Sequence, residues 1–428
     1  MIRWHGIAAT VGGGLLVLAC AAGLLALGPG TPAPPPGRVA APPPPADRLA
    51  AARQATEARP QDATAWAELG LAAVDRARTT PEGGQLTEAA RALADSLALR
   101  PEHNYEAQVG SGMLANARHE FAAAREFGRS ATTMAPDRAA GYAVLADAEI
   151  QLGDYPAATA ATQRLLDLAP GSAAFTRASY DLETHGRTGE AVFAQERALE
   201  LAGTPEEQAF CAHRLGDLAW EQGELATAEQ HYRHALALRS DDRFAAFGAA
   251  RTAAALGRTE EALQRYGELV ERAPQPQFLL ELAELQLAAG HPAAAQLAAL
   301  DAEVRLATGP VDLALARYLA DHGDAAQAVR LLTEEWGRRR SVLVAEELGW
   351  ALHRAGRDGE ALPHARFAVE SGSGSALSRY RLGAVEHALG LPGADDLLRA
   401  VLRSHPHFSA YHAGKARQLL GAPGEGER

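Results

Sequence analysis

Histidines that could hold a metal ion occur in two places in the sequence. His231 and His234 lie three residues apart with Glu229 beside them, and three more gather near the end of the chain: His405, His407 and His412. A spacing of three puts two side chains on one face of a helix, which suits two ligands of a zinc ion. No third ligand accompanies the first pair. We therefore interpret that pair as a solvated helix face, and we predict no metal site.

Other residues that could take part in catalysis or ligand binding also lack suitable partners nearby in the sequence. Cys211 lies in an apolar helical pattern and is interpreted as a small buried hydrophobe. Arg338, Arg339 and Arg340 follow a helical pattern, where cations complement the carboxyl end of a helix. The sequence has no HExxH, P-loop, GxSxG or CxxC motif. It therefore predicts no catalytic residue, no cofactor and no enzyme. An active site assembled from dispersed residues stays open as the alternative.

The composition favours helices and disfavours nucleic acid as a partner. The chain has 428 residues, of which 47% are hydrophobic and only 6% aromatic, and alanine is abundant. Alanine is the best helix former, so an all-α fold is expected and β-sandwiches or barrels are not. The formal net charge is −12, which repels phosphate unless a local basic stripe is present. We predict no nucleic-acid partner.

The N-terminus has the composition of a membrane segment. Residues 4–28 contain no Asp, Glu, Lys or Arg, and residues 7–27 are almost wholly apolar. At 1.5 Å per residue, such a helix reaches the roughly 30 Å of the hydrocarbon core. We assign residues 1–28 to a transmembrane anchor or signal segment. Residues 29–46 are rich in proline and form an extended linker.

Three interpretations of this N-terminal segment stay open. An uncleaved anchor is favoured because the apolar run continues past any plausible cleavage point. The run Val17-Leu18-Ala19-Cys20 resembles a lipobox, which would make the protein a lipoprotein lipidated at Cys20. A cleaved secretory signal is the third. The short tail with Arg3 resembles a signal-anchor, so the large domain is expected outside the cytoplasm at the cell membrane, with the reverse topology as the alternative.

The rest of the chain is organised by one internal repeat. A glycine ends an apolar helical pattern eight times, with successive spacings of 33, 37, 34, 33, 33, 33 and 34 residues: Gly153, Gly186, Gly223, Gly257, Gly290, Gly323, Gly356 and Gly390. An alanine usually follows five residues later. In the unit 211–242, Gly223 suits the left-handed backbone conformation that ends a helix. Ala228 lets the second helix approach the first closely.

These features make the chain resemble the tetratricopeptide repeat family. The opening pattern of that family is matched by Trp66, Leu69 and Gly70, and by Tyr142, Leu145 and Ala146. The closing pattern is matched by Ala228, Tyr232 and Ala235, and unit-ending prolines stand at Pro101, Pro136, Pro170 and Pro274. The resemblance implies a right-handed superhelical solenoid of about ten helix-turn-helix repeats over residues 47–421, with 422–428 as a disordered tail. About ten units fit between residues 62 and 407, and residues 408–420 form a closing helix.

The resemblance also implies a concave groove, lined by the first helix of each unit, that binds a protein or peptide. In three consecutive units, the positions expected to face this groove are unusually rich in aromatic residues. The expected groove residues are Tyr180, Phe210, His213, Asp217, Trp220, Phe244, Phe247, Arg251, Leu280, Glu284, Arg317, Trp350, His353 and Arg354. Aromatic anchors with flanking charge are typical of interfaces. Packing between units is the alternative role of each aromatic residue.

The sequence thus predicts a membrane-tethered scaffold that binds another protein, whose identity the sequence does not give. Apolar anchors would engage a partner segment, and Asp217, Arg251, Glu284 and Arg317 would set its register through charge. The alternative is a small-ligand or metal-binding lipoprotein of the cell envelope that uses groove or C-terminal histidines. Because fold alone does not determine function, the choice depends on the site itself.

Overall fold

A computed structural model describes residues 45–79, 84–372 and 374–421. These residues form 22 α-helices and no strand. The helices are α1 (Pro45–Ala58), α2 (Ala63–Thr79), α3 (Gln85–Leu99), α4 (Tyr105–Ala117), α5 (Phe121–Met134), α6 (Ala139–Leu152), α7 (Tyr155–Leu168), α8 (Ser172–Thr184), α9 (Thr188–Leu201), α10 (Pro205–Glu221), α11 (Leu225–Leu238), α12 (Arg243–Ala255), α13 (Thr259–Arg272), α14 (Pro276–Ala288), α15 (Ala294–Leu306), α16 (Leu313–His322), α17 (Ala325–Arg338), α18 (Val342–Arg354), α19 (Asp358–Glu370), α20 (Ala376–Ala388), α21 (Ala394–Ser404) and α22 (His412–Leu419). The expectation of an all-α fold is confirmed for these residues.

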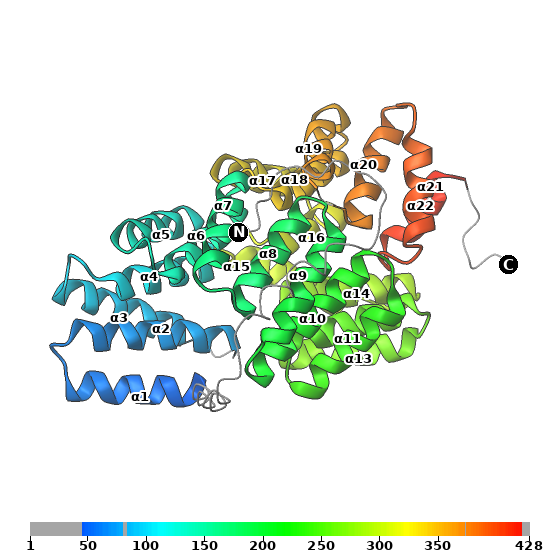
Figure 1. Ribbon diagram of the computed structural model, residues 1–428. Helices are drawn as coiled ribbons and strands as arrows, with labels where there is room; N and C mark the ends of the chain where they lie inside the picture. Colours follow the sequence, from blue (N-terminus) through cyan, green and yellow to red (C-terminus); the bar gives the residue numbers. More distant parts are fainter. Residues whose placement is uncertain (1–44, 80–83, 373, 422–428) are drawn as a thin grey trace, which may run out of the picture. The chain divides into compact units, whose positions relative to one another are not determined.

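The helices from α2 to α21 form ten consecutive antiparallel pairs (Figure 1). The even-numbered helix of each pair is its first helix, and the odd-numbered one is its second. Each first helix packs on its own second helix, and in most of the array it also packs on the first helix of the next pair. A lone α1 precedes the array, and α22 follows it. This is the helix-turn-helix repetition that the glycine spacing predicts.

Seven of the eight repeat glycines adopt the left-handed conformation that the sequence predicts for Gly223. Their φ angles lie between +65° and +84°, and each lies one or two residues after the last residue of a first helix. Because a Cβ atom disfavours this region, glycine is the residue suited to it. Gly323 is the exception, with a φ of −122°. The left-handed turn predicted at Gly223 is therefore confirmed, and the other units except the one at Gly323 share it.

Small residues let aromatic side chains fill the spaces between first helices. Ala228 is fully buried, and the ring of Tyr232 is inserted between Gly216 on α10 and Gly248 on α12. A Cβ at either glycine would lie within 2.6 Å of that ring. Close packing of this kind leaves no room for a methyl group. The predicted close approach of the two helices at Ala228 is confirmed.

Two pairs depart from the common register. In the other pairs with a repeat glycine the second helix starts two residues after it, whereas α15 starts four residues after Gly290 and α21 four residues after Gly390. The consequence is clearest in α15. His291 and Pro292 fill the longer turn. As a result Ala295 is exposed, and Ala293 and Leu300 take the buried positions. A shift of two residues turns a helical face by about 200°, so the alanine spacing misplaces this face.

Turns of the array that are far apart in the sequence touch along a line that we call the seam. The turn at Gly153 contacts residues 339–342: the Arg340 amide donates to the Leu152 carbonyl at 3.1 Å, and the Val342 amide donates to Tyr155 Oη at 2.7 Å. The turn at Gly186 meets Gly372, and the turn at Gly223 meets Ser404 and His405. These partners are separated by 181 to 188 residues. The seam therefore joins the third, fourth and fifth pairs to the last three.

The predicted anchor or signal (1–28) lies outside the described residues, as do the linker up to residue 44 and the tail 422–428. Within the part of the chain that the structure does describe, none of the helices is long and apolar enough to cross a membrane.

Candidate protein-binding surface

Aromatic rings from three successive first helices form a continuous row. Phe210 on α10 contacts His213 edge-on with ring centroids 5.1 Å apart, and His213 stacks on Phe244 of α12 at 6.1 Å. Phe244 in turn meets Phe278 of α14, which also contacts Phe247 at 5.0 Å. We call Phe210, His213, Phe244, Phe247 and Phe278 the aromatic row. It extends across neighbouring pairs, so one ligand segment could contact several of its rings.

Accessibility is uneven along the aromatic row. Phe244 is 40% exposed, Phe210 and Phe247 are half-buried, and His213 and Phe278 are buried. His213 is held by Asp242, whose Oδ2 lies 3.5 Å from Nδ1. Asp242 also caps α12 by accepting from the amides of Phe244 and Ala245, which fixes where that helix begins. The exposed ring of Phe244 is therefore positioned by a capped helix and by buried rings behind it.

Tyr180 extends the accessible aromatic surface to α8. Its side chain is 37% exposed, and the guanidinium of Arg214 lies 4.0 Å from the ring centroid. Arg214 is itself anchored, because it donates to Glu183 at 2.7 Å and to Asp217 at 2.9 Å. Cation–π contact of this kind orients the ring while leaving one face free.

Asp217 joins three donors rather than facing an open groove. It accepts hydrogen bonds from Tyr232 at 2.7 Å, from Arg214 at 2.9 Å and from Arg251 at 3.0 Å. Burial alone would raise the pKa of its carboxyl, but the charges of Arg214 and Arg251 hold that pKa below its ordinary value. Asp217 and Arg251 thus join neighbouring first helices to each other.

The other charged groove residues are paired in the same manner. Arg317 donates to Glu347, which also pairs with Arg381 at 3.2 Å. Glu284 is buried and lies 3.3 Å from His322. These charges stabilise contacts between repeats in the structure, and the register role that the sequence predicts for them toward a partner stays a prediction.

Glu221 is the exception in this charged interior, because it has no hydrogen-bond or ion-pair partner among the described residues. Burial raises the pKa of this carboxyl to about 7, and the attraction of Arg251 offsets only part of that rise. Nearby Glu183 and Glu346 add to it by repulsion.

Both tryptophans of the predicted groove are buried, contrary to the expectation that they face it. Trp220 is 6% exposed because His405, from the turn before α22, packs edge-on against it at 4.8 Å. Trp350 is 2% exposed, and His412 covers it at 5.3 Å. Leu280 is buried in the core between the pairs. The covering residues are distant in sequence, so helical periodicity within one unit could not reveal them.

The last two predicted groove residues lie at the end of α18. His353 Nδ1 is 2.5 Å from Asp358 Oδ1. Arg354 is exposed, and its Nε lies 3.3 Å from Asp321 Oδ1. Neither belongs to the aromatic row, so the structure does not gather all the predicted groove residues into one site.

The residues considered for metal or nucleophilic chemistry remain separate. Among the described residues, no three His, Cys, Asp or Glu side chains are grouped so that they could hold a metal ion. His231 is half-buried and His234 exposed, as on a solvated face. Cys211 is buried 3.5 Å from Ser172 Oγ, and burial raises the pKa of its thiol. A thiol with a raised pKa is a poor nucleophile at neutral pH.

Three functionally placed residues carry no clear signal in the sequence. Arg339 is buried in the seam, where it donates to Glu335 and to Gln151. His405 and His412 cover the two tryptophans. The sequence places Arg339 at a helix end and the histidines in a terminal cluster, but it does not reveal their partners across the fold.

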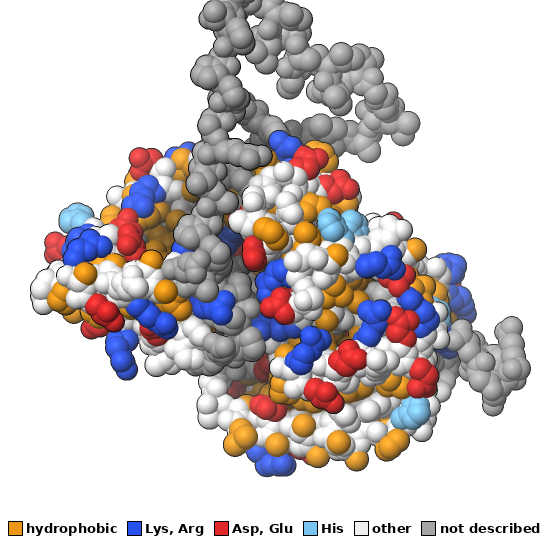
Figure 2. Space-filling model, turned by 90° about the horizontal axis from the view of Figure 1, so that it is seen from below, with side chains coloured by type: hydrophobic (Ala, Val, Ile, Leu, Met, Phe, Trp, Pro, Cys, Tyr) orange, Lys and Arg blue, Asp and Glu red, His pale blue; other side chains and the backbone are white. Residues whose placement is uncertain are grey.

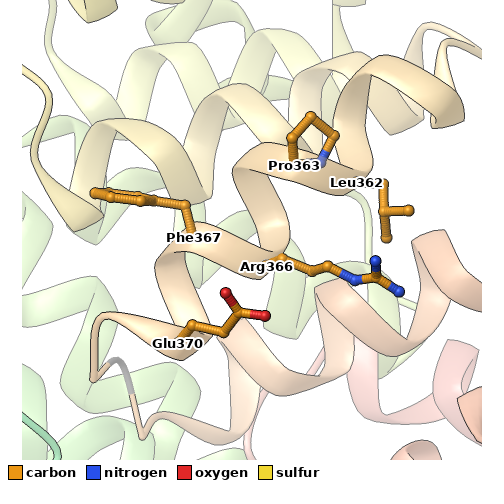
Figure 3. A pocket seen from close by; sticks show the side chains of 5 residues that line it. All are labelled: Leu362, Pro363, Arg366, Phe367 and Glu370. Carbon is orange, nitrogen blue, oxygen red and sulfur yellow. The ribbon is translucent and has the colours of Figure 1, made fainter.

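The face of the described residues drawn in Figure 2 shows no large patch of a single charge. On the face drawn in Figure 2, acidic and basic side chains are interspersed with hydrophobic ones. One hollow of about 430 Å³ lies along α19, where Leu362, Pro363, Arg366, Phe367 and Glu370 line it (Figure 3). All five come from a single helix. No predicted groove residue lines this hollow, so the aromatic row remains the stronger candidate.

Comparison with known proteins gives matches to a repeat family and to solved helical structures. The tetratricopeptide repeat model matches residues 213–266 and 247–309. No curated protein matches the sequence.

Solved structures similar to this chain come from both bacteria and humans. PilW, described as a widely conserved type IV pilus biogenesis factor, is 19% identical with a TM-score of 0.42, over 47% of this chain and 94% of that one. PilF from Pseudomonas aeruginosa is 20% identical with a TM-score of 0.40, over 52% and 99%. The human IFIT1 dimer with PPP-AAAA is 15% identical with a TM-score of 0.49, over 72% of each chain. The residues matched by the repeat model include His213, Phe244, Phe247 and Phe278 of the aromatic row, and Phe210 lies just before them.

Proposed function

We propose that this protein is a tetratricopeptide-type scaffold that binds an extended or helical segment of another protein along the aromatic row. The observation that carries the proposal is the exposed ring of Phe244, which continues through ring contacts to half-buried Phe210 and Phe247. Large aromatic side chains on a rigid support supply much of the binding energy of interfaces. Tyr180, with Arg214 behind it, adds an anchor on the next helix toward the N-terminus.

A photo-crosslinking amino acid at position 244 of the full-length protein tests this proposal in the native cell. We expect one dominant crosslinked protein, and we expect Phe210→Ala in the same chain to reduce its yield at least tenfold. Phe193 is the matched control position because it is 67% exposed on the second helix α9, outside the aromatic row. Equal crosslinking from positions 193 and 244, or crosslinks only within the chain, would contradict the proposal.

We further propose that residues 7–27 tether the scaffold to the cell membrane, with the helical array outside the cytoplasm. The apolar run and the absence of charge over residues 4–28 support this arrangement. The proline-rich linker would then separate the array from the bilayer. Lipidation at Cys20 and cleavage after a secretory signal are the two competing processing routes.

The tether and its orientation can be tested separately from partner binding. Ala40→Cys in a Cys20→Ser background places a thiol in the linker, while Cys211 is buried. We expect an impermeant maleimide to label position 40 in intact cells, and carbonate washing to leave the protein in the membrane fraction. Labelling only after lysis would reverse the topology. Release into the medium would identify a cleaved signal, and incorporation of labelled fatty acid that requires Cys20 would identify a lipoprotein.

A further inference from the structure

A buried carboxylate surrounded by aromatic rings lies between α16, α18 and the end of the chain. Asp321 Oδ2 accepts from Trp350 Nε1 at 3.0 Å and lies 3.2 Å from His412 Nε2. The imidazole of His412 is 5.3 Å from the Trp350 ring and 5.5 Å from the Tyr380 ring. We call Asp321, Trp350 and Tyr380 the cage. His412, only 1% exposed, is the side chain that fills it.

The chemistry of the cage suits a cation. A carboxylate with aromatic faces on two sides attracts a positive group both by charge and through the ring quadrupoles. Burial alone would raise the pKa of Asp321, but His412 and Arg381 lower it well below its ordinary value, so the carboxyl is ionised. Arg354 Nε lies 3.3 Å from the other oxygen at the mouth of the cage. The cage is therefore built around a negative charge that is fixed in position.

The residues around His412 also make contacts with aromatic and charged groups. Phe408 packs on Tyr380 at 5.4 Å, and Tyr411 contacts His322 at 4.8 Å. His322 is in turn paired with Glu284. Lys415 lies with its Nζ 3.7 Å above the Tyr411 ring. Phe408, Tyr411 and His412 thus face aromatic and acidic groups of the array, and Lys415 adds a positive charge within the segment itself.

This terminal segment ends in a short helix. Helix α22 has eight residues and packs mainly on α20 and α21, while the side chains of Tyr411 and His412 reach α16 and α18. Short helices with few packing partners open locally at a small fraction of the free energy of global unfolding. A tethered segment of this kind acts as a competitor at an effective concentration on the order of millimolar. It can protect a buried site and still be displaced.

We propose that the cage is a recognition site for a cationic side chain carried by a segment of a partner protein, and that the chain's own His412 occupies it until the partner displaces residues 408–415. The site lies on α16, α18 and α20, whereas the aromatic row lies on α10, α12 and α14. The proposal therefore does not depend on the proposed function of the aromatic row, and the two can fail independently.

A labelled peptide with the sequence of residues 408–421 tests the cage in trans. Its binding to the full-length protein in detergent is measured by fluorescence anisotropy, with the wild-type chain and the Tyr411→Ala/His412→Ala variant. We expect the variant, whose own segment competes poorly, to bind the peptide at least tenfold more tightly than the wild type does. A control peptide with alanine in place of the histidine should bind the variant at least tenfold more weakly. Absence of binding by the folded variant, or equal binding of the two peptides, would overturn the proposal.

Hydrogen exchange of the unmodified protein decides the case in which the variant fails to fold. We expect the amides of α22 to exchange at least a hundredfold faster than those of α18 and α20 under native conditions, which requires local opening of the terminal segment. If α22 is instead protected to the same degree as α18 and α20, it is a permanent part of the core and the cage is not a binding site.

Discussion

Two kinds of turn in this array have the same sequence signal and the same backbone conformation but different surroundings. At Gly153 an added Cβ would lie 2.2 Å from the Arg340 carbonyl oxygen, and at Gly223 it would lie 2.4 Å from the Ser404 carbonyl oxygen. At Gly257 and Gly290 nothing lies within 4 Å. Gly153 and Gly223 therefore meet two requirements, the left-handed turn and the close contact in the seam. Gly257 and Gly290 meet only the first. A local signal thus specifies the turn and does not specify what the turn contacts.

The largest effect is expected from substituting the two kinds of glycine in parallel. Gly153→Ala combines left-handed strain, about 1–2 kcal/mol, with displacement of the seam, about 1–3 kcal/mol. Gly257→Ala incurs the strain alone. Thermal unfolding followed by circular dichroism should show a loss of about 3–4 kcal/mol for the first and about 1 kcal/mol for the second. If the two losses are equal, the seam adds nothing to stability.

The seam is also expected to weaken in acid because of His405. Burial lowers the pKa of this histidine to about 4, with Arg251, His407 and Arg379 adding to the effect, and both ring nitrogens lack a partner. In the unfolded chain the same group takes up a proton near pH 6.5. Acidification from pH 6.5 to 4 therefore favours the unfolded state, by up to about 3 kcal/mol.

The variant His405→Phe keeps a ring against Trp220 but cannot take up a proton. Chemical denaturation at a series of pH values should therefore show a flatter profile between pH 6.5 and 4 than in the wild type. His291→Phe is the control, since His291 is exposed in a turn that lacks the seam. A profile unchanged by His405→Phe would mean that the seam does not respond to protonation at this position.

A smaller effect is expected from one hydrogen bond across the seam. Tyr155 Oη accepts from the Val342 amide at 2.7 Å, and Tyr155→Phe leaves that partly buried amide without its partner, at a cost of about 1 kcal/mol. Tyr142→Phe removes an exposed bond to the Pro136 carbonyl within one unit and serves as the comparison. We expect urea unfolding to show a larger loss in the free energy of unfolding for Tyr155→Phe than for Tyr142→Phe. A larger loss for Tyr142→Phe would contradict the importance of the seam bond.

The smallest effect is expected at Gly323, which differs from both kinds of turn. Its φ is −122°, so an alanine there is not in the left-handed region, and the nearest obstacle is the side chain of Leu319 at 3.1 Å. Gly323→Ala should change the free energy of unfolding by no more than about 0.5 kcal/mol. A loss as large as that of Gly257→Ala would show that this turn adopts the left-handed conformation in solution.

The fold was largely predictable from the sequence because its signals are local. Glycine spacing identifies the helix pairs, and Ala228 identifies a close approach within one pair. Where local spacing is interrupted, as at His291 and Pro292, the same reasoning misplaces the buried face of α15. The accessibility of Trp220 and Trp350 could not be predicted in this way. It depends on His405 and His412, which reach those rings only through the accumulated rotation of several pairs.

The candidate site was predictable to the extent that it depends on single helices. Phe210, Phe244 and Phe247 were placed on first helices from spacing alone, and the structure brings them together in the aromatic row. Phe278, which completes that row, lies two residues before Leu280, the residue that the repeat pattern predicts for the groove in this unit, so the pattern passed over it. The charges of Asp217 and Arg251 were assigned to a partner because a sequence does not show that two distant residues neutralise each other.

The seam also limits how this protein can change over evolutionary time. Arrays of this type commonly grow or shrink by duplication or loss of a whole unit, because each unit contacts only its neighbours. Here the turns at Gly153, Gly186 and Gly223 each meet a segment 181 to 188 residues further along the chain. Inserting or deleting one pair between residues 224 and 338 would displace all three contacts at once. We therefore expect descendants of this chain to vary in unit number outside that interval and to keep it constant within it.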